Sequence, residues 1–238
     1  MERFGMRPAS AFRTTAEVPA ERATAFLQKV YRWMFIGLAV TAFVAFAVAS
    51  SPTMLRYVLS NPLLYFGLIV AELGLVFYLS ARVETLAPNV AMMLFLAYAA
   101  LNGVTLSFIL LVYTGESIAT TFVVTAGMFG ALALYGSTTK RSLAGAGQFF
   151  FMGLIGLVLA SIVGMFWHND ALQFLISTIG VIVFTGLTAW DAQRLKLMAA
   201  TVPESQSGSY AVVGALALYL NFINLFLMLL RLLGGRRD

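Results

Sequence analysis

Long apolar runs separated by short polar joints fill this chain from Val30 onward. A hydrocarbon core of roughly 30 Å requires about 20 helical residues, and each run is close to that length. Seven runs qualify, at Val30–Ala49, Leu63–Ala81, Asn89–Tyr113, Ile118–Gly136, Phe149–Trp167, Ala171–Trp190 and Ala211–Leu233. The pattern predicts an all-α polytopic membrane protein with seven transmembrane helices, in which residues 30–233 form one membrane domain.

Composition supports a protein whose main partner is the lipid bilayer. The 238 residues are 61% hydrophobic and 11% charged, against about 25% charged residues in soluble domains. The net charge of +5 comes from basic residues scattered at the ends of the runs, where they meet anionic headgroups, so we expect no nucleic-acid binding. Cysteine is absent, which removes disulfide and thiolate chemistry.

The polar ends of the chain predict its orientation. We expect residues 1–29 to form a polar cytoplasmic tail and residues 234–238 a short basic tail. The first run is too long for the apolar region of a signal peptide, so it is expected to be retained. With the N-terminus inside, eleven basic residues lie inside and four outside, as the positive-inside rule favours. The four outside are Arg56, Arg231, Arg236 and Arg237.

Two features of the second half of the chain bear on this topology. The last run is long and contains no proline, so a full crossing is favoured over a re-entrant segment. Residues 191–210 include a stretch rich in serine, proline and glycine, which is typical of a mobile inner loop. Such a loop serves as a gate in some proteins and as an ordinary linker in more of them.

Several polar residues fall at middle depth in the predicted spans. Glu72 lies about 14 Å along its helix from Leu63, close to the bilayer centre. Charge at that depth is costly, so it marks an ion or proton site by default. The structural alternative is a protonated acid bonded to a neighbouring helix. Asn102, Asn221 and Asn224 occur at similar depths, so a polar cluster around Glu72 is expected. Of these, we predict that Asn102 and Asn224 line an ion pathway with Glu72.

Arg82 and Asp191 form a second candidate pair. Each ends a predicted span on the cytoplasmic side, at a poorly hydrated mouth. The two side chains would close on each other as a latch that opens when the acid gains a proton or a cation competes. The alternatives are that Arg82 is a snorkelling anchor and that Asp191 pairs locally with Arg194 or Lys196.

Five segments resemble the transmembrane Bax inhibitor motif family, of the Bax inhibitor-1 type. FTGLTAWDAQRL at Phe184–Leu195 and LYLNFINLFLMLLRLLG at Leu218–Gly234 carry its signature. Three more segments are similar to its bacterial branch, namely GLVFYLSARV at Gly74–Val83, LNGVTLSFILLVYTGESI at Leu101–Ile118 and ALYGSTTKRSLAGAGQF at Ala133–Phe149. Each motif alone is modest, but the five occur in the family's order, and the resemblance extends over nearly all of the chain after Val30.

The resemblance implies a fold and a function. The expected fold is a bundle in which the last helix is central and the other six surround it. The expected function is a proton-sensitive calcium leak through this bundle, with calcium as the permeant ion and no cofactor. The family's aspartate at the place of Asp191 pairs with an aspartate of the last helix, and an arginine at the place of Arg82 helps to hold the closed state.

This chain departs from the family at one position of that switch. The family commonly has LDFINLF where this chain has LNFINLF, so Asn221 replaces the second aspartate. Two adjacent carboxylates repel each other, whereas an amide does not repel a carboxylate. We therefore expect a response in a more acidic range, a dependence on Glu72, or a protein locked toward one state. Calcium would bind only transiently, at Glu72 or Asp191.

Other functions remain open at this point. HExxH, GxSxG and phosphate-binding glycine motifs are absent and His168 is the single histidine, so we expect no enzyme. A proton-coupled secondary transporter would suit the same acids, although the two halves show no convincing repeat. The family also suggests a membrane interaction protein that controls a membrane protease or a stress response. We expect a monomer in the bacterial inner membrane.

Overall fold

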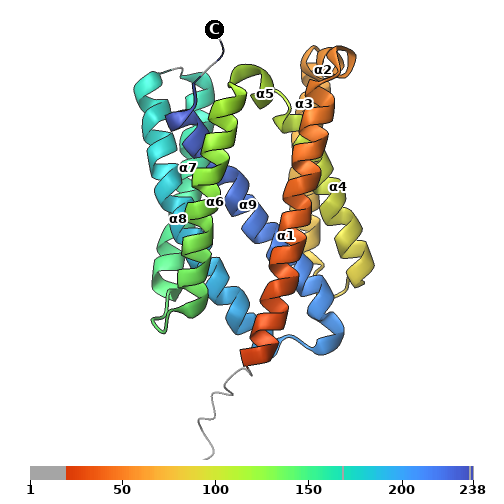
Figure 1. Cartoon of the computed structure of the whole chain (residues 1–238), viewed down its shortest axis with the longest axis vertical. Helices are drawn as coiled ribbons and strands as arrows, with labels where there is room; N and C mark the ends of the chain where they lie inside the picture. The colour runs from red at the N-terminus through yellow and green to blue at the C-terminus, as the bar shows by residue number, and fades with distance from the viewer. Residues whose placement is uncertain (1–19, 168, 236, 238) are drawn as a thin grey trace, which may run out of the picture.

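The computed structural model describes residues 20–167, 169–235 and 237 of the chain. This part is a bundle of helices that run up and down (Figure 1). The long helices are α1 (Ala20–Ala49), α3 (Pro62–Ala81), α4 (Pro88–Leu106), α6 (Gly115–Thr138), α7 (Ala144–Phe166), α8 (Asp170–Thr201) and α9 (Ser207–Leu233). Shorter helices are α2 (Pro52–Leu59), α5 (Ile109–Val112) and the 3₁₀ helix η2 (Glu204–Gln206). Within the described residues, seven helical segments are long and apolar enough to cross a membrane, as expected.

The first helix starts earlier than the apolar run suggested. It begins at Ala20 and not at Val30, and Ala23 and Phe26 are buried in the main core. Residues 20–29 therefore belong to the bundle, and the expected tail of 29 residues is too long. Ala23, Phe26 and Val30 recur at the helical spacing of three or four, but the intervening charges concealed this pattern. Residues 1–19 of the expected tail lie outside the described residues.

The sixth span also differs from its prediction. Helix α8 continues beyond Trp190 to Thr201, so most of the expected inner loop at residues 191–210 is helix. Residues 191–201 are mostly good helix formers, and Leu195 and Ala199 are buried on one face. Only residues 202–206, which include η2, separate α8 from α9.

The turns that join α5 to α6 and α7 to α8 are short. Thr114 caps the N-terminus of α6, where its side chain accepts a hydrogen bond from the Ser117 amide at 3.2 Å. Asn169 caps α8 through the amides of Ala171 and Leu172. Such caps satisfy amides that have no partner within the helix. His168, the histidine of the second turn, lies outside the described residues.

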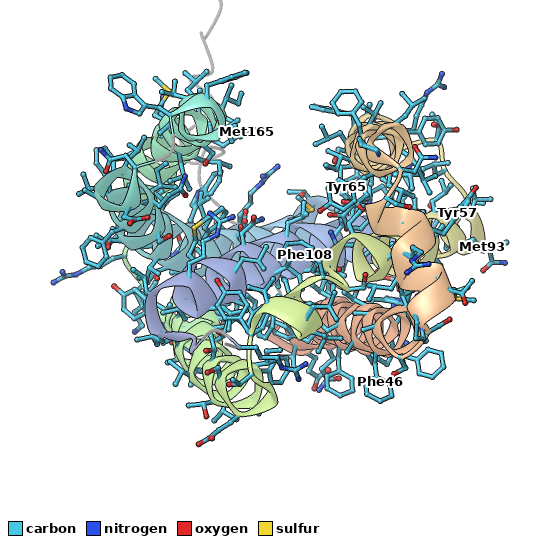
Figure 2. The ribbon with its side chains drawn as sticks, turned by 90° about the horizontal axis from the view of Figure 1, so that it is seen from above. Phe46, Tyr57, Tyr65, Met93, Phe108 and Met165 are labelled. Atoms are coloured by element: carbon cyan, nitrogen blue, oxygen red, sulfur yellow. The ribbon has the colours of Figure 1, made fainter. Side chains whose placement is uncertain are left out.

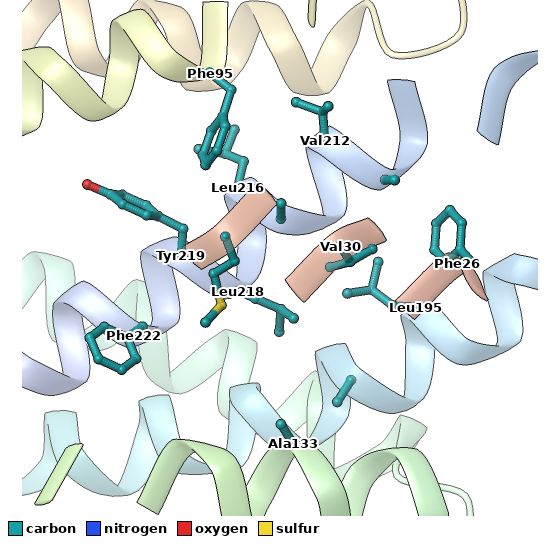
Figure 3. Close-up of a cluster of buried hydrophobic side chains, with 14 of the residues drawn as sticks. Phe26, Val30, Phe95, Ala133, Leu195, Val212, Leu216, Leu218, Tyr219 and Phe222 are labelled. Atoms are coloured by element: carbon teal, nitrogen blue, oxygen red, sulfur yellow. The ribbon is translucent and has the colours of Figure 1, made fainter. Parts of the chain in front are cut away.

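Helix α9 is the core of the bundle, in agreement with the expected central last helix. It packs against α8, α1, α6 and α4, and most of its residues are buried. Figure 3 shows Leu216, Tyr219 and Phe222 of α9 among side chains from several other helices. Phe95 meets the Tyr219 ring edge-on, with centroids 5.8 Å apart.

The outside of the bundle is apolar, as in a protein surrounded by lipid. Phe46, Met93 and Met165 are each about two-thirds exposed or more and point away from the bundle axis (Figure 2). Helix α1 begins at the bottom of Figure 1, and α9 begins near the bottom and ends near the top. The last helix therefore runs from one end of the bundle to the other and is not re-entrant. We refer to the end where α1 begins as the inner end and to the other as the outer end.

Candidate functional site

A hydrogen bond between an amide and a carboxylate joins the middle of α8 to the middle of α9. The Nδ2 of Asn221 donates to Oδ2 of Asp191 at 2.7 Å, and both side chains are buried. Asp191 lies about 15 Å along α8 from Thr201, since each helical residue rises 1.5 Å. This contact connects the central helix α9 to α8, the helix against which it packs most extensively. When Asp191 is ionised, the bond is about twice as strong as a bond between neutral groups.

Asp191 also lines a cavity of about 340 Å³ between α3, α8 and α9. Its polar lining comes from Ser80, Asp191, Arg194 and Tyr210, and the remaining walls are apolar. Val83 follows the end of α3, and Tyr210 lies in the first turn of α9. This space, called the inner cavity below, therefore extends from the Asp191–Asn221 pair to the inner end of the bundle.

The expected latch between Arg82 and Asp191 is not formed in this structure. Arg82 is the C-terminal cap residue of α3, and its amide donates to the Tyr78 carbonyl at 3.0 Å. Its side chain is exposed, and no ion pair joins it to Asp191 in the described part of the chain. The sequence placed both residues at the ends of spans, but only Arg82 is at an end. Asp191 lies deeper because α8 is longer than its apolar run.

Asp191 forms no direct ion pair with Lys196 or Arg194 in the described part of the chain, although the charge of Arg194 acts on it. The Nζ of Lys196 donates to the Ser137 carbonyl of α6 at 2.7 Å. The guanidinium of Arg194 lies over the Trp190 ring, 5.6 Å from its centroid, an arrangement favoured by cation–π attraction. Arg194 still contributes positive charge to the inner cavity that Asp191 lines.

Glu72 is the centre of a second polar cluster, formed between α3 and α4. Its Oε1 accepts a hydrogen bond from Oγ1 of Thr105 at 2.9 Å. Its Oε2 accepts a bond from Nδ2 of Asn102 at 3.3 Å. The structure thus brings together Glu72 and Asn102, as counting of helical depth predicted.

The cluster extends to the central helix through one tyrosine. The hydroxyl of Tyr219 donates to Oδ1 of Asn102 at 3.0 Å, which orients the amide so that its NH₂ group faces Glu72. The same hydroxyl lies 2.6 Å from Oγ1 of Thr41 on α1. We call Glu72, Thr105, Asn102, Tyr219 and Thr41 the Glu72 network. It joins α3, α4, α9 and α1 inside the bundle.

The other two asparagines at middle depth form their hydrogen bonds with other groups. Asn221 bonds Asp191, as described above, and Nδ2 of Asn224 donates to the Leu220 carbonyl of its own helix at 2.8 Å. The expected polar cluster around Glu72 therefore forms without hydrogen bonds from Asn221 or Asn224, while a place for Asn224 in an ion pathway stays a prediction. Depth along a helix can be counted from sequence, but the direction in which a side chain points depends on the packing of the helices.

The Glu72 network is able to hold a proton without rearranging its backbone. The single hydroxyl proton of Thr105 has three acceptors within reach, which are Glu72 Oε1 and the carbonyls of Asn102 at 3.0 Å and Leu101 at 3.4 Å. When Glu72 is ionised, this hydroxyl donates to it. When Glu72 carries a proton, the hydroxyl turns to a carbonyl and accepts from the acid. Rotation of one hydroxyl thus accommodates both states.

The described residues contain no group of three or more histidine, cysteine, aspartate or glutamate side chains that could hold a metal ion. A divalent cation at either acid would be bound by a single carboxylate and neutral oxygens. Such a donor set, with few charges, corresponds to weak binding.

Sequence reasoning missed several members of these two sites. The sequence could have predicted Thr105 as a member, because it follows Asn102 by three residues and so shares its helix face. Tyr219 and Thr41 gave no comparable signal, since an aromatic residue and a threonine in an apolar helix are ordinary packing residues. Their role depends on how α1 and α9 approach α4, which periodicity does not reveal.

Comparison with known proteins identifies the family to which this chain belongs. The family model described as "Inhibitor of apoptosis-promoting Bax1" matches residues 23–238. The chain is 52% identical over 215 residues to "Inner membrane protein YbhL" of Escherichia coli (strain K12), which covers 89% of this chain and 92% of that protein. A Borreliella burgdorferi protein is 44% identical over 90% of this chain and 93% of its own length.

A relative from Deinococcus radiodurans is 40% identical over 94% of this chain and 96% of its own length. The match to the family model includes the segments that contain Glu72, Asp191 and Asn221. This chain is thus an integral membrane protein that belongs to the bacterial branch of the Bax inhibitor-1 (transmembrane Bax inhibitor motif) family.

Proposed function

We propose that this protein is a pH-sensitive calcium leak channel of the Bax inhibitor-1 type. The observation that carries the proposal is the position of Asp191. This acid is buried at the deep end of the inner cavity and is bonded to Asn221 on the central helix. A carboxylate there attracts a cation that has entered the cavity, and it also holds the two helices together.

Protonation of Asp191 affects both of these roles. The neutral acid attracts a cation less, and its bond to the Asn221 amide loses the contribution of charge. Flux through the protein is therefore expected to depend on pH through this one side chain. Asn221 removes the carboxylate–carboxylate repulsion that the family's usual pair contains, so the response is expected in a more acidic range.

Glu72 provides the second acid of the proposed path. Val76 and Ser80 line the inner cavity from α3, and Glu72 lies one helical turn before Val76 on the same face. A cation that reaches the deep end of the cavity is thus close to two acids, one on α8 and one on α3. Both are anchored to neighbouring helices, Glu72 by Thr105 and Asn102.

The proposed orientation places the N-terminus in the cytoplasm of a bacterium and the protein in its inner membrane. The relative from Escherichia coli is named an inner membrane protein. The excess of basic residues at the inner end supports the same orientation. The inner cavity then opens toward the cytoplasm, where it samples cytoplasmic pH.

The pH profile of calcium flux tests this proposal. Purified protein in proteoliposomes is compared with Asp191→Asn and Asn221→Asp across a pH series, using a dye trapped inside the vesicles. Asp191→Asn should flatten the profile, because the titrating group is lost. Asn221→Asp should move its midpoint to higher pH, because one of two adjacent carboxylates retains its proton longer. Three identical profiles would contradict the proposal.

A further inference from the structure

The outer end of the bundle contains a second cavity on the same helix pair. This cavity measures about 580 Å³ and is lined mostly by polar groups from the start of α8 and the end of α9. Its lining includes Asn169, Asp170, Gln173, Ser177 and Arg231. We call it the outer cavity.

The inner and outer cavities lie along one line of the α8–α9 contact. The two helices run in opposite directions (Figure 1). Asp191 meets Asn221 at the inner cavity, whereas Ser177 and Arg231 both line the outer cavity. Ser177 and Asp191 are separated by about 21 Å along α8. Between them the facing positions on the two helices are Gly180 and Met228.

The layer between the two cavities is closed and apolar. Met228, Phe184 and Leu225 are all buried, and they belong to one hydrophobic cluster with Leu157 of α7. A Cβ atom added to Gly180 would lie 2.8 Å from both Cγ and Sδ of Met228. Real Cβ atoms essentially never approach another atom so closely. The Met228 side chain thus occupies the space that the missing Gly180 side chain leaves.

We propose that Met228, seated against Gly180, is the hydrophobic gate of the cation path. This inference rests on the proposed function. An apolar constriction excludes water and therefore hydrated cations, although polar cavities lie on both sides of it. Methionine is unbranched and flexible, so a small separation of α8 and α9 lets this side chain leave the Gly180 notch. The Asp191–Asn221 bond, which joins the same two helices, opposes that separation.

The absence of cysteine from the chain makes single-cysteine labelling a direct test. Gln173→Cys in the outer cavity, Ala217→Cys in the inner cavity and Met228→Cys at the gate are made one at a time. Each is treated with a membrane-impermeant thiol reagent in intact cells and in inverted membrane vesicles. The gate model predicts that position 173 reacts from the outer side only and position 217 from the inner side only. From both sides, labelling at position 228 should be at least about tenfold slower than labelling of the other two positions from their accessible side.

Calcium flux through Met228→Ser in proteoliposomes is the second arm, with Met228→Leu as the matched control. The serine variant should leak about tenfold faster than the natural protein, since a hydroxyl lets water enter the layer. The leucine variant should stay within about twofold, because the layer remains apolar. Rapid labelling at position 228 from either side, or equal leaks in both variants, would overturn the gate. If labelling follows the prediction while no variant passes calcium, the leak function fails but the closed layer stands.

Discussion

Single side chains determine how the acids of this bundle are held. Asp191 and Glu72 both lie within membrane-spanning helices, yet each accepts a hydrogen bond from an asparagine on another helix. Burial of a carboxyl group is tolerated when it is bonded in this way. The depth of Glu72 and its neighbour Asn102 could be predicted from the sequence. The partner of Asp191 was implied only by the family resemblance, because Asn221 alone resembles any polar residue in a span.

Tyr219 allows a test of the Glu72 network at this scale. Tyr219→Phe removes the hydroxyl that contacts Asn102 and Thr41 but keeps the buried ring. Loss of one partner in a buried network costs about 1–3 kcal/mol, so the unfolding temperature in detergent should fall by several degrees.

Tyr98→Phe is the matched control. This residue is also buried, and its ring also meets the Tyr219 ring edge-on, with centroids 5.8 Å apart. No hydrogen bond of its hydroxyl is found among the described residues, so the substitution should change stability much less. Equal losses in the two variants would show that the Tyr219 hydroxyl does not bridge the helices.

The lengths of the apolar runs predicted where the membrane-spanning helices lie, but the polar residues beside these runs did not predict where each helix begins and ends. All seven spans could be located from the sequence, because a bilayer of fixed thickness demands runs of about 20 apolar residues. The extensions of α1 back to Ala20 and of α8 on to Thr201 could not. These turns project into the polar region beyond the hydrocarbon core, where mixed sequences form helices as readily as loops. Because α8 was expected to end at Trp190, Asp191 was expected at the end of the span, and this led to the incorrect prediction of a latch with Arg82.

Helices α6 and α8 approach each other closely at Gly136. A Cβ at Gly136 of α6 would collide with the backbone of Ala189 on α8, so these two helices touch through their main chains. Gly136→Ala should therefore destabilise the protein by about 1–3 kcal/mol, as overpacking does. Gly130→Ala on the same helix is the control, because its Cβ would meet nothing within 4 Å. Thermal unfolding in detergent measures both, and a Gly136→Ala variant as stable as Gly130→Ala would contradict this packing.

On the scale of the bundle as a whole, the described residues form a cavity lined in part by polar groups toward each end. The inner cavity reaches Asp191 from one side, and the outer cavity reaches Ser177 from the other. Helix α9 lines both cavities and carries Asn221, Met228 and Tyr219. A shift of this one helix would therefore act on the gate, the Asp191 pair and the Glu72 network together. Sequence could predict that the last helix is central only through the family, since its apolar pattern resembles that of its neighbours.

We expect cations to cross the membrane domain along a path that contains Glu72 and Asp191. The most direct measurement is calcium entry into proteoliposomes that contain only this purified protein, across a series of pH values. The natural protein is compared with empty vesicles, with the double variant Glu72→Gln/Asp191→Asn, and with Glu116→Gln, whose acid is exposed in the first turn of α6. We expect a leak above that of empty vesicles, which Glu116→Gln should retain and the double variant should lose. No leak at any pH, or a double variant that leaks like the natural protein, would contradict it.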